Sequence, residues 1–464
     1  MEVICSSKNM EVAMRRVRTN KGAAGVDGMT VRELAKYLKV HWPRIQDQLL
    51  SGTYRPMPVR RVEIPKPDGG VRKLGIPTVV DRLIQQAVLQ ALTPLWEPTF
   101  SEHSYGFRPG RSAHQAVGQA QAYIAEGRVW VVDIDLEKFF DRVHHDRLMA
   151  RLARRIADKR LLKLIRGYLN AGVMVNGLVS PTREGTPQGG PLSPLLSNIV
   201  LDELDRELEH RGHTFVRYAD DCNVYVRSER AGRRVMEGIT DFITRKLKLK
   251  VNQKKSAVDR PHKRKFLGFC FTTGKFLKRR ISPQALQRFR KKVKALTRRT
   301  RGIDAQRMVD QLTVYLRGWI GYYGFCQTPS VLKGLDSWIA RRLRCVAWKH
   351  WRHPRRRFRQ LVRRGIPPAW AKAAAMRQPN PGRASNDRAV EWALPKRLWY
   401  GLGLLSLETA WGDTQPTEPP CTDPYARWCG RGRAARPAPI PIRWQVRRRG
   451  TPPPDRIDPQ THRP

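Results

Sequence analysis

The spacing of apolar residues along this chain predicts amphipathic helices through much of its first half. Residues 1–60 show helical periodicity broken by loops, and residues 30–33 have the capping-box pattern that opens a helix. Pro56 and Pro58 are expected to end this region. Apolar stripes with a period near 3.6 residues predict further helices over residues 81–92, 147–170, 195–209 and 232–249.

Alternating apolar and polar residues predict strands between these helices. Residues 59–77 read as a hairpin whose turn is Lys-Pro-Asp-Gly-Gly, and residues 214–226 read as a second hairpin. Residues 129–136 are a strongly apolar strand candidate that contains two acids. Residues 265–269 are expected to form a short strand with a glycine at which another part of the chain approaches closely.

Acidic residues interrupt two of the predicted strands. Asp220 and Asp221 fall at or near the tip of the second hairpin, where adjacent carboxylates repel each other unless solvent or a cation stabilises them. A solvated turn is the plain interpretation, since Asp is a common turn residue. Strand alternation places Asp133 and Asp135 on one face, where burial is costly without a cation or hydrogen-bond donors. A structural ion pair is the alternative there.

The overall charge indicates a polyanionic partner. The chain has 89 Lys and Arg against 40 Asp and Glu, a formal net charge of +49 and a pI near 11.1. Nucleic acid is the default partner for such an excess. We find no apolar run long enough to span a membrane and no signal-peptide pattern, so a cytoplasmic location is expected. Seven scattered cysteines without a C-x-x-C pair favour free thiols over a zinc site or a disulfide framework.

Two long basic segments strengthen the expectation of nucleic-acid binding. Residues 279–301 and 341–364 contain no acid, and tryptophans and tyrosines are interleaved with them. A basic run is often only a solvated face, but the aromatic residues favour contact with RNA or DNA. The loop at 104–112, which is rich in Gly, Arg and aromatic residues, also suits such contact. Residues 414–464 are rich in Pro and are expected to be disordered.

The acids and the basic charge together suggest a specific chemistry. Nucleotidyl transfer uses carboxylates from separate elements to hold two Mg²⁺ ions about 3.5–4 Å apart. Mg²⁺ prefers oxygen ligands and often takes few of them from the protein. Asp135, Asp220 and Asp221 would supply them. His144 and His145 do not favour a second, transition-metal site, because they are adjacent rather than four residues apart.

The order of these motifs resembles that of bacterial group II intron-encoded reverse transcriptase/maturases of the compact, endonuclease-lacking type. The matching motifs lie at residues 66–77, 104–112, 135–141, 186–189, 218–221, 252–256 and 266–269. The resemblance implies an α+β, right-hand polymerase fold. It assigns residues 1–60 to an N-terminal extension, 61–278 to fingers and palm with an antiparallel sheet, 279–350 to an α-helical thumb or maturase domain, 351–413 to a basic extension that is a candidate DNA-binding region, and 414–464 to a Pro-rich tail.

The resemblance also implies roles for individual residues. Asp135, Asp220 and Asp221 would be catalytic and, with Leu136, would bind two Mg²⁺ ions, leaving Asp133 as a structural acid. The implied nucleotide-binding residues are Lys66 and Arg72 on the triphosphate, Phe140 beneath the sugar, Gln188 in the pocket and Lys255 beside the departing pyrophosphate. From the residues alone, Lys66 and Arg72 could equally be ordinary cations of a solvated hairpin. The residues implied or expected to contact RNA or template are Arg108, Arg111, Pro187, Gly189, Arg279, Arg280, Arg290, Lys291 and Lys292.

The function implied is that of an RNA-directed DNA polymerase that also binds intron RNA and assists splicing and intron mobility. Its partners would be intron RNA, an RNA template, a DNA primer or target, and dNTPs. A non-enzymatic RNA-binding splicing factor on a polymerase fold, and a stand-alone or defence-associated reverse transcriptase, are the alternatives. The endonuclease of many relatives is expected to be absent, because Cys421 and Cys429 have no partner pair and no H-N-H triplet follows.

Overall fold

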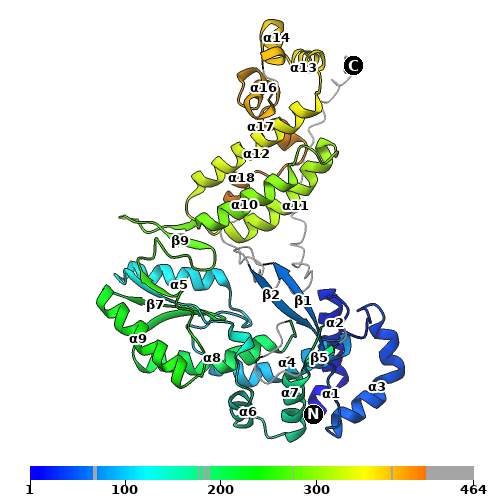
Figure 1. Cartoon of the computed structure of the whole chain (residues 1–464), viewed down its shortest axis with the longest axis vertical. Coiled ribbons are helices and arrows are strands. Elements are labelled where there is room, and N and C mark those ends of the chain that lie inside the picture. Colours follow the sequence, from blue (N-terminus) through cyan, green and yellow to red (C-terminus); the bar gives the residue numbers. More distant parts are fainter. Residues whose placement is uncertain are drawn as a thin grey trace, which may run out of the picture.

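The computed structural model describes residues 1–65, 70–175, 178–180, 185, 189–274, 276–377 and 380–413. These residues form two bodies stacked along the long axis of the molecule (Figure 1). The first body mixes helices and sheets, and the second is helical. The predicted α+β class is therefore confirmed, while the predicted tail at 414–464 lies outside the described residues.

Helices make up the N-terminal part of the first body. The Glu33 carboxylate accepts hydrogen bonds from the backbone and the hydroxyl of Thr30, as the capping pattern predicts, although the helix itself begins one residue later. The helices of this body are α1 (Glu2–Cys5), α2 (Ser7–Asn20), α3 (Leu34–Leu50), α4 (Val79–Trp96), α5 (Ala113–Ala125), α6 (His145–Ala153), α7 (Lys159–Asn170), α8 (Ser193–His210) and α9 (Glu229–Arg245), with short 3-10 turns η1 (Glu97–Thr99) and η2 (Phe139–Asp141). They confirm the helices predicted at 81–92 and 195–209, while the region predicted at 147–170 forms two helices, α6 and α7, and the helix predicted at 232–249 ends at Arg245.

One four-stranded sheet contains the first predicted hairpin. β1 (Val59–Pro65) pairs antiparallel with β2 (Val71–Ile76), so that Arg60 lies opposite Ile76 and Pro65 opposite Val71. β4 (Val173–Val175) and β5 (Leu178–Ser180) complete the order β2-β1-β4-β5. In Figure 1 this hairpin rises from the first body toward the second.

The other four-stranded sheet lies between the two hydrophobic cores. Its order is β6-β7-β3-β8, from β6 (Thr214–Tyr218), β7 (Asp221–Val226), β3 (Trp130–Ile134) and β8 (Ala257–Asp259). Because side chains alternate along a strand, Val132 and Val224 pack in the core of the first body, while Val131 and Tyr225 pack in the core that continues into the second. The acidic hairpin β6–β7 is thus fixed from both faces.

A short hairpin joins the two bodies, and it corrects one sequence prediction. Residues 266–269 form a tight turn rather than a strand, because Leu267 and Gly268 adopt positive φ angles of 49° and 84° and Phe266 pairs with Phe269. The strands are β9 (Phe269–Phe271) and β10 (Arg279–Ile281). The close approach predicted at the glycine is present, since a Cβ on Gly268 would lie 2.8 Å from the Tyr323 hydroxyl.

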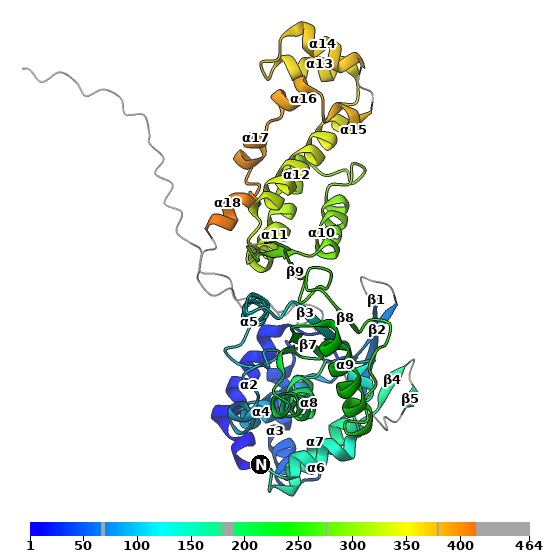
Figure 2. The same cartoon turned by 90° about the vertical axis from the view of Figure 1, so that its left-hand side faces the viewer.

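All regular secondary structure among the described residues of the second body is helical. Its helices are α10 (Pro283–Leu296), α11 (Ala305–Tyr323), α12 (Pro329–His350), α13 (Pro354–Val362), α14 (Pro368–Arg377), α15 (Pro381–Ala384), α16 (Arg388–Ala393), α17 (Lys396–Gly401) and α18 (Leu407–Gly412). The long helix α12 runs up this body, and α13, α14 and α16 lie at its far end (Figures 1 and 2). In the described part of the chain, every helix is too short or too polar to cross a bilayer. The five cysteines described are buried and free.

Candidate active site

The two adjacent acids lie at the tip of the β6–β7 hairpin, as the sequence predicts. Tyr218 pairs with Asp221, which leaves Ala219 and Asp220 as the two turn residues. Ala219 has a φ of 56°, the positive value that tight two-residue hairpin turns require. An L-residue other than Asn or Asp rarely adopts this conformation, so surrounding interactions must hold the turn.

A buried arginine holds the turn from beneath. Arg217 and Asp205 have no exposed side-chain surface, and the guanidinium bonds the carboxylate through Nε at 2.6 Å and Nη2 at 2.5 Å. Its other N–H groups donate to Asn198 Oδ1 at 3.0 Å, the Ala219 carbonyl at 2.9 Å and Ser104 Oγ at 2.7 Å. All five N–H donors of the guanidinium therefore have an acceptor. The ion pair connects α8, the turn and the loop that follows η1.

That loop packs directly against the turn. The Gly106 carbonyl accepts a hydrogen bond from Asn198 Nδ2 at 2.9 Å. A Cβ on Gly106 would lie 2.3 Å from the Ala219 nitrogen, so no larger residue fits without moving one of the two segments. The Gly-rich loop at 104–112, which we expected to contact nucleic acid, thus supports the acidic turn.

Asp135 follows β3 and is held by the segment that contains the predicted lysine. Its backbone nitrogen donates to Ser256 Oγ at 3.0 Å, and its carbonyl accepts from the Asn252 nitrogen at 2.8 Å. Its carboxylate lies 3.3 Å from Lys255 Nζ and 3.4 Å from Asn252 Nδ2. The two motifs that the sequence separates by more than a hundred residues are therefore adjacent.

Asp133 has a different partner from Asp135. Its carboxylate accepts two hydrogen bonds from Arg264, at 2.6 and 3.0 Å. The structural ion pair that we considered for this strand is thus present at Asp133. Of the two acids on this strand, Asp135 is therefore the candidate to share a metal ion with Asp220 and Asp221.

The three acids share one electrostatic environment. Burial raises the pKa of the Asp220 carboxyl, and the charge of Asp135 raises it further, whereas the charges of Arg72 and Arg217 lower it. Burial raises the pKa of Asp221 well above its usual value, and the charges of Asp220, Asp133 and Asp135 add to this effect. Partly buried carboxylates that repel one another are stabilised by a cation between them. Their oxygen donors fit a divalent cation of the Mg²⁺ type.

The carboxylates are not arranged as a complete metal cage. Among the described residues, no three His, Cys, Asp or Glu side chains come close enough together to hold an ion. Lys255 approaches the Asp135 carboxylate, and Leu136 beside it is buried, with its backbone bridged to Val251. Mg²⁺ sites that use one or two carboxylates plus substrate phosphates are completed only when substrate is bound.

The remaining predicted nucleotide residues can be placed only in part. Arg72 lies on β2, close enough to Asp220 to lower the pKa of its carboxyl. Phe140 is buried in η2 and stacks edge-on against Phe139. Lys66, Pro187 and Gln188 lie outside the described residues.

The described residues of the loop at 185–190 pack against two different segments, Gly185 against η2 and Gly189 against β2. A Cβ on Gly185 would lie 2.7 Å from the Phe140 carbonyl, and one on Gly189, whose φ is 128°, would lie 2.7 Å from the Gly75 carbonyl. His145 Nε2 lies 2.6 Å from the Gly185 carbonyl, which gives this histidine a structural contact. The glycines bring the backbone close to its neighbours, as the sequence suggests.

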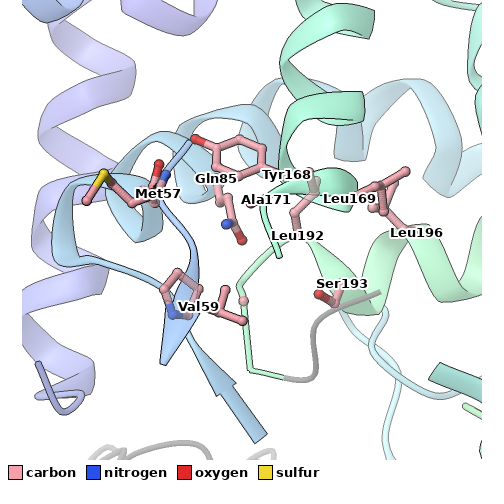
Figure 3. A pocket seen from close by; sticks show the side chains of 12 residues that line it. Met57, Val59, Gln85, Tyr168, Leu169, Ala171, Leu192, Ser193 and Leu196 are labelled. Atoms are coloured by element: carbon pink, nitrogen blue, oxygen red, sulfur yellow. Dashed lines mark hydrogen bonds between the residues drawn. The ribbon is translucent and has the colours of Figure 1, made fainter. Parts of the chain in front are cut away.

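A small cavity of about 20 Å³ lies beneath this loop (Figure 3). Gly190 lies beside Gln85, where a Cβ would be 2.3 Å from the side-chain oxygen. Asp81 also lines the cavity, and burial raises its pKa to about 6 despite hydrogen bonds from Tyr54 and Thr78. The volume holds a single water molecule and is too small for a nucleotide.

The residues predicted to bind RNA or template divide into two groups. Arg108 is 7% exposed and is bound to Glu97 and to the carbonyls of Ser101 and Ser104, so its guanidinium faces the protein. Arg279 likewise donates inward, to the Phe325 carbonyl and to Gln121. Both guanidinium groups thus have acceptors within the protein, and their contact with RNA or template stays a prediction.

The other described cations of this set are more accessible. Arg280, Arg290, Lys291 and Lys292 are exposed, and the last three are consecutive residues of α10. Arg111 is partly exposed, pairs with Glu102 and lies over Tyr105. Exposed cations clustered on one helix are suited to phosphate contact.

Sequence reasoning missed the network around Arg217. One signal was present, because Asp205 interrupts the apolar stripe of the helix predicted at 195–209. A carboxylate on the buried side of a helix requires a partner. Nothing in the sequence identified that partner as Arg217.

Two protein families match this chain in tandem. Residues 64–271 match "Reverse transcriptase (RNA-dependent DNA polymerase)", and residues 286–365 match "Group II intron, maturase-specific domain". The first match contains the acidic hairpin and Asp135. The second begins in α10, at the start of the helical body.

Individual relatives agree with these matches. Protein YkfC of Escherichia coli (strain K12) is 43% identical over 218 residues, covering 46% of this chain and 57% of the relative. Group II intron-encoded protein LtrA of Lactococcus lactis subsp. cremoris is 39% identical over 203 residues, covering 42% of this chain and 32% of the relative. The matched region thus spans less than two thirds of either relative.

Among solved structures, a partial Cas6-RT-Cas1–Cas2 complex is similar over 52% of this chain and 42% of its own, with 26% identity and a TM-score of 0.34. A likeness this weak adds nothing to the assignment, which depends on the two tandem families and the named relatives. In two consecutive regions, residues 64–271 and 286–365, the chain is similar to the group II intron-encoded reverse transcriptase/maturases.

Proposed function

We propose that this chain copies RNA into DNA by two-metal nucleotidyl transfer and that it binds intron RNA to assist splicing and mobility. The observation that supports this most directly is the acidic turn. A buried ion pair holds the turn that carries Asp220 and Asp221, and the charge of Asp135 raises the pKa of both acids, a repulsion that a plain turn would not require. The tandem reverse transcriptase and maturase-specific matches support the same function.

In this proposal the acids of the site hold two Mg²⁺ ions. Asp135, Asp220 and Asp221, with the backbone next to Asp135 at Leu136, would be the ligands, and Asp220 would be the closer of the adjacent pair. Bound Mg²⁺ would activate the primer 3′-hydroxyl and neutralise charge on the transferred phosphoryl group. The raised pKa values of Asp220 and Asp221 fit this role, because a bound cation would favour their ionised forms.

Basic residues around the acids would orient the nucleotide. Arg72 would bind the triphosphate together with Lys66, since both belong to the hairpin that the sequence predicts at 59–77. Lys255 would leave the Asp135 carboxylate and assist departure of pyrophosphate. Phe140 would exclude a 2′-hydroxyl, Gln188 would line the nucleotide pocket, and Gly189 would contact the template. The RNA template and DNA primer would be the nucleic-acid substrates.

We assign the parts of the molecule to the subdomains of a right-hand polymerase. Residues 61–278 would be fingers and palm, with the β6-β7-β3-β8 sheet as the palm floor. Residues 279–350 would be the thumb, whose exposed cations on α10 are directed to RNA. Residues 351–413 would extend this body toward DNA.

A primer-extension assay on an RNA template tests the proposal. Asp220→Ala and Asp221→Ala, made together, should abolish Mg²⁺-dependent extension and leave RNA binding within about twofold, because the phosphate-binding cations are unchanged. Asp241→Ala is the matched control, since this acid is exposed on α9 and pairs with the neighbouring Arg245. Extension that persists in the double variant would exclude the assigned acids.

The same assay separates the proposal from a non-enzymatic splicing factor. A splicing factor on this fold would bind intron RNA and promote splicing, but it would extend no primer in any divalent metal. Wild-type chain that is folded and binds RNA, yet gives no extension with Mg²⁺ or Mn²⁺, would favour that alternative.

A further inference from the structure

Two tryptophans lie exposed at the far end of the helical body. Trp370 on α14 is 45% exposed and Trp392 on α16 is 52% exposed. Among the described residues they are the only tryptophans that are exposed to this degree, and they contact each other, with ring centroids 5.6 Å apart and planes tilted by 38°. Large aromatic side chains are usually buried, so two exposed together mark a contact surface.

A cation belongs to the same surface. Arg388 precedes Trp392 by one helical turn, and its guanidinium carbon lies 5.0 Å from the centre of that ring. Arg377 is exposed two turns after Trp370, on the same face of α14. We name Trp370, Trp392, Arg388 and Arg377 the tryptophan platform.

The charge around the platform identifies the class of partner. Residues 352–397 contain thirteen Arg and Lys but only two acids, Asp387 and Glu391. Both acids are occupied, since Asp387 caps α16 at the Ala389 nitrogen and Glu391 pairs with Arg344 at 3.1 Å. A surface of exposed rings with cations and no available carboxylate suits a polyanion that offers flat rings.

We propose that the tryptophan platform binds single-stranded nucleic acid by stacking unpaired bases on Trp370 and Trp392, with Arg388 and Arg377 contacting the phosphates. Duplex bases are already paired and stacked and cannot reach the rings. The platform lies beyond both matched families, which end at residue 365. It is also distant from the acidic hairpin, because α14 and α16 and the sheet with β7 lie in opposite bodies (Figures 1 and 2).

Binding should be measured in the full chain with Asp220→Ala in the background. The result then does not depend on whether the chain polymerises, so failure of this proposal and failure of the proposed function can be told apart. The probes are a short single-stranded DNA, the matching RNA and the corresponding duplex, each containing 2-aminopurine, whose fluorescence changes when it stacks.

Replacing Trp370 and Trp392 with Leu should weaken single-strand binding by about tenfold or more, because each stacked base contributes about 1–3 kcal/mol. The dependence of affinity on salt should keep its slope, since every phosphate-binding cation is retained. Replacing both with Phe should restore most of the affinity. Arg388→Gln should instead lower the salt slope by about 0.7.

Controls separate stacking from a structural role for the ring pair. Val314→Ala removes an exposed apolar side chain elsewhere on the helical body and should change neither affinity nor slope. Thermal unfolding of each variant reports whether α14 and α16 remain packed.

Three outcomes would overturn the proposal. One is full affinity in a folded Leu variant. Another is an equal decrease in affinity for duplex and single strand. The third is a change in self-association without a change in binding, which would identify the platform as an interface between copies of this chain.

Discussion

Arg217 places a full positive charge where its side chain has no exposed surface. A buried ion pair does not by itself stabilise a fold, because removing two charges from water costs as much as their attraction returns. Here the charge is fully hydrogen-bonded, and one bond goes to the carbonyl of Ala219, the residue with the unfavourable positive φ. The pair therefore specifies the conformation of the turn more than it stabilises the body around it.

Removing one partner of this pair should be strongly destabilising. Asp205→Asn leaves the Arg217 charge buried without a counter-charge and should lower the free energy of unfolding of the first body by about 3–5 kcal/mol. Urea denaturation followed by fluorescence measures this. Replacing both partners by apolar residues, Arg217→Met with Asp205→Leu, should cost less than the single change.

The control for this prediction is an exposed ion pair. Glu229 and Arg233 lie one turn apart on α9 with both side chains largely in solvent. Glu229→Gln should cost less than about 1 kcal/mol. An Asp205→Asn variant as stable as this control would contradict the assigned role of the pair.

At the scale of elements, local pattern predicted most of what is present. Both hairpins and the amphipathic helices follow from the period of apolar residues, which is a local property. The turn at 266–269 was mistaken for a strand because an aromatic-rich run is equally apolar in either form, and Tyr323, which packs on Gly268, lies more than fifty residues away.

The protein contacts of two arginines at the candidate site were equally hidden from the local pattern. Arg108 and Arg279 were predicted to contact nucleic acid because they lie in basic, Gly-rich or aromatic-rich segments. Their acceptors include the Glu97 carboxylate and the Phe325 carbonyl, which lie 11 and 46 residues away in the sequence and are brought within reach by the fold. Composition indicates that a chain binds a polyanion, but it does not distinguish an arginine that faces solvent from one that holds a loop.

The packing of the Gly106 loop on the hairpin gives a prediction at this scale. Gly106→Ala places a Cβ where the Ala219 nitrogen would be 2.3 Å away, so the acidic turn must shift. Displacement of catalytic groups by about 1 Å can reduce a rate by about a hundredfold. We expect primer extension to fall by about ten- to a hundredfold, measured as the single-turnover rate at saturating dNTP.

A substitution of a second glycine in the same loop tests whether the loss of activity comes from the contact of residue 106 with the acidic turn. Gly110 belongs to the same loop, but a Cβ there would have no heavy atom within 4 Å. Gly110→Asn, which tolerates the positive φ at this residue, should keep nearly full activity. An equal decrease in both variants would indicate a general effect of the loop.

At the scale of the whole molecule, the two hydrophobic cores meet at one sheet. Alternate residues of β3 and β7 pack into the first body and into the core shared with the helical body, so the acidic hairpin and α10 are mechanically linked. The Lys and Arg residues that give the chain its large positive charge fall into two groups, those buried in the fold and those exposed on its surface. Cations such as Arg217 and Arg108 are buried and bonded to acceptors within the protein, whereas those of α10 are exposed to solvent.

This division predicts which cations control the salt dependence of RNA binding. Each phosphate that is no longer neutralised by a cation should lower the slope of log affinity against log salt by about 0.7–0.9. Changing Arg290, Lys291 and Lys292 to Gln should therefore reduce the slope by about two to three. Filter binding of RNA across a salt series measures it.

An equal change of charge elsewhere is the control for this last prediction. Arg230, Arg233 and Arg234 are exposed on α9 of the first body, and their replacement by Gln removes the same net charge. If binding depended only on the overall field of the protein, both triple variants would weaken RNA binding alike. If α10 binds the RNA backbone directly, the α9 variant should keep a slope within about one unit of the wild type, and a difference of about two or more between the variants would assign phosphate binding to α10.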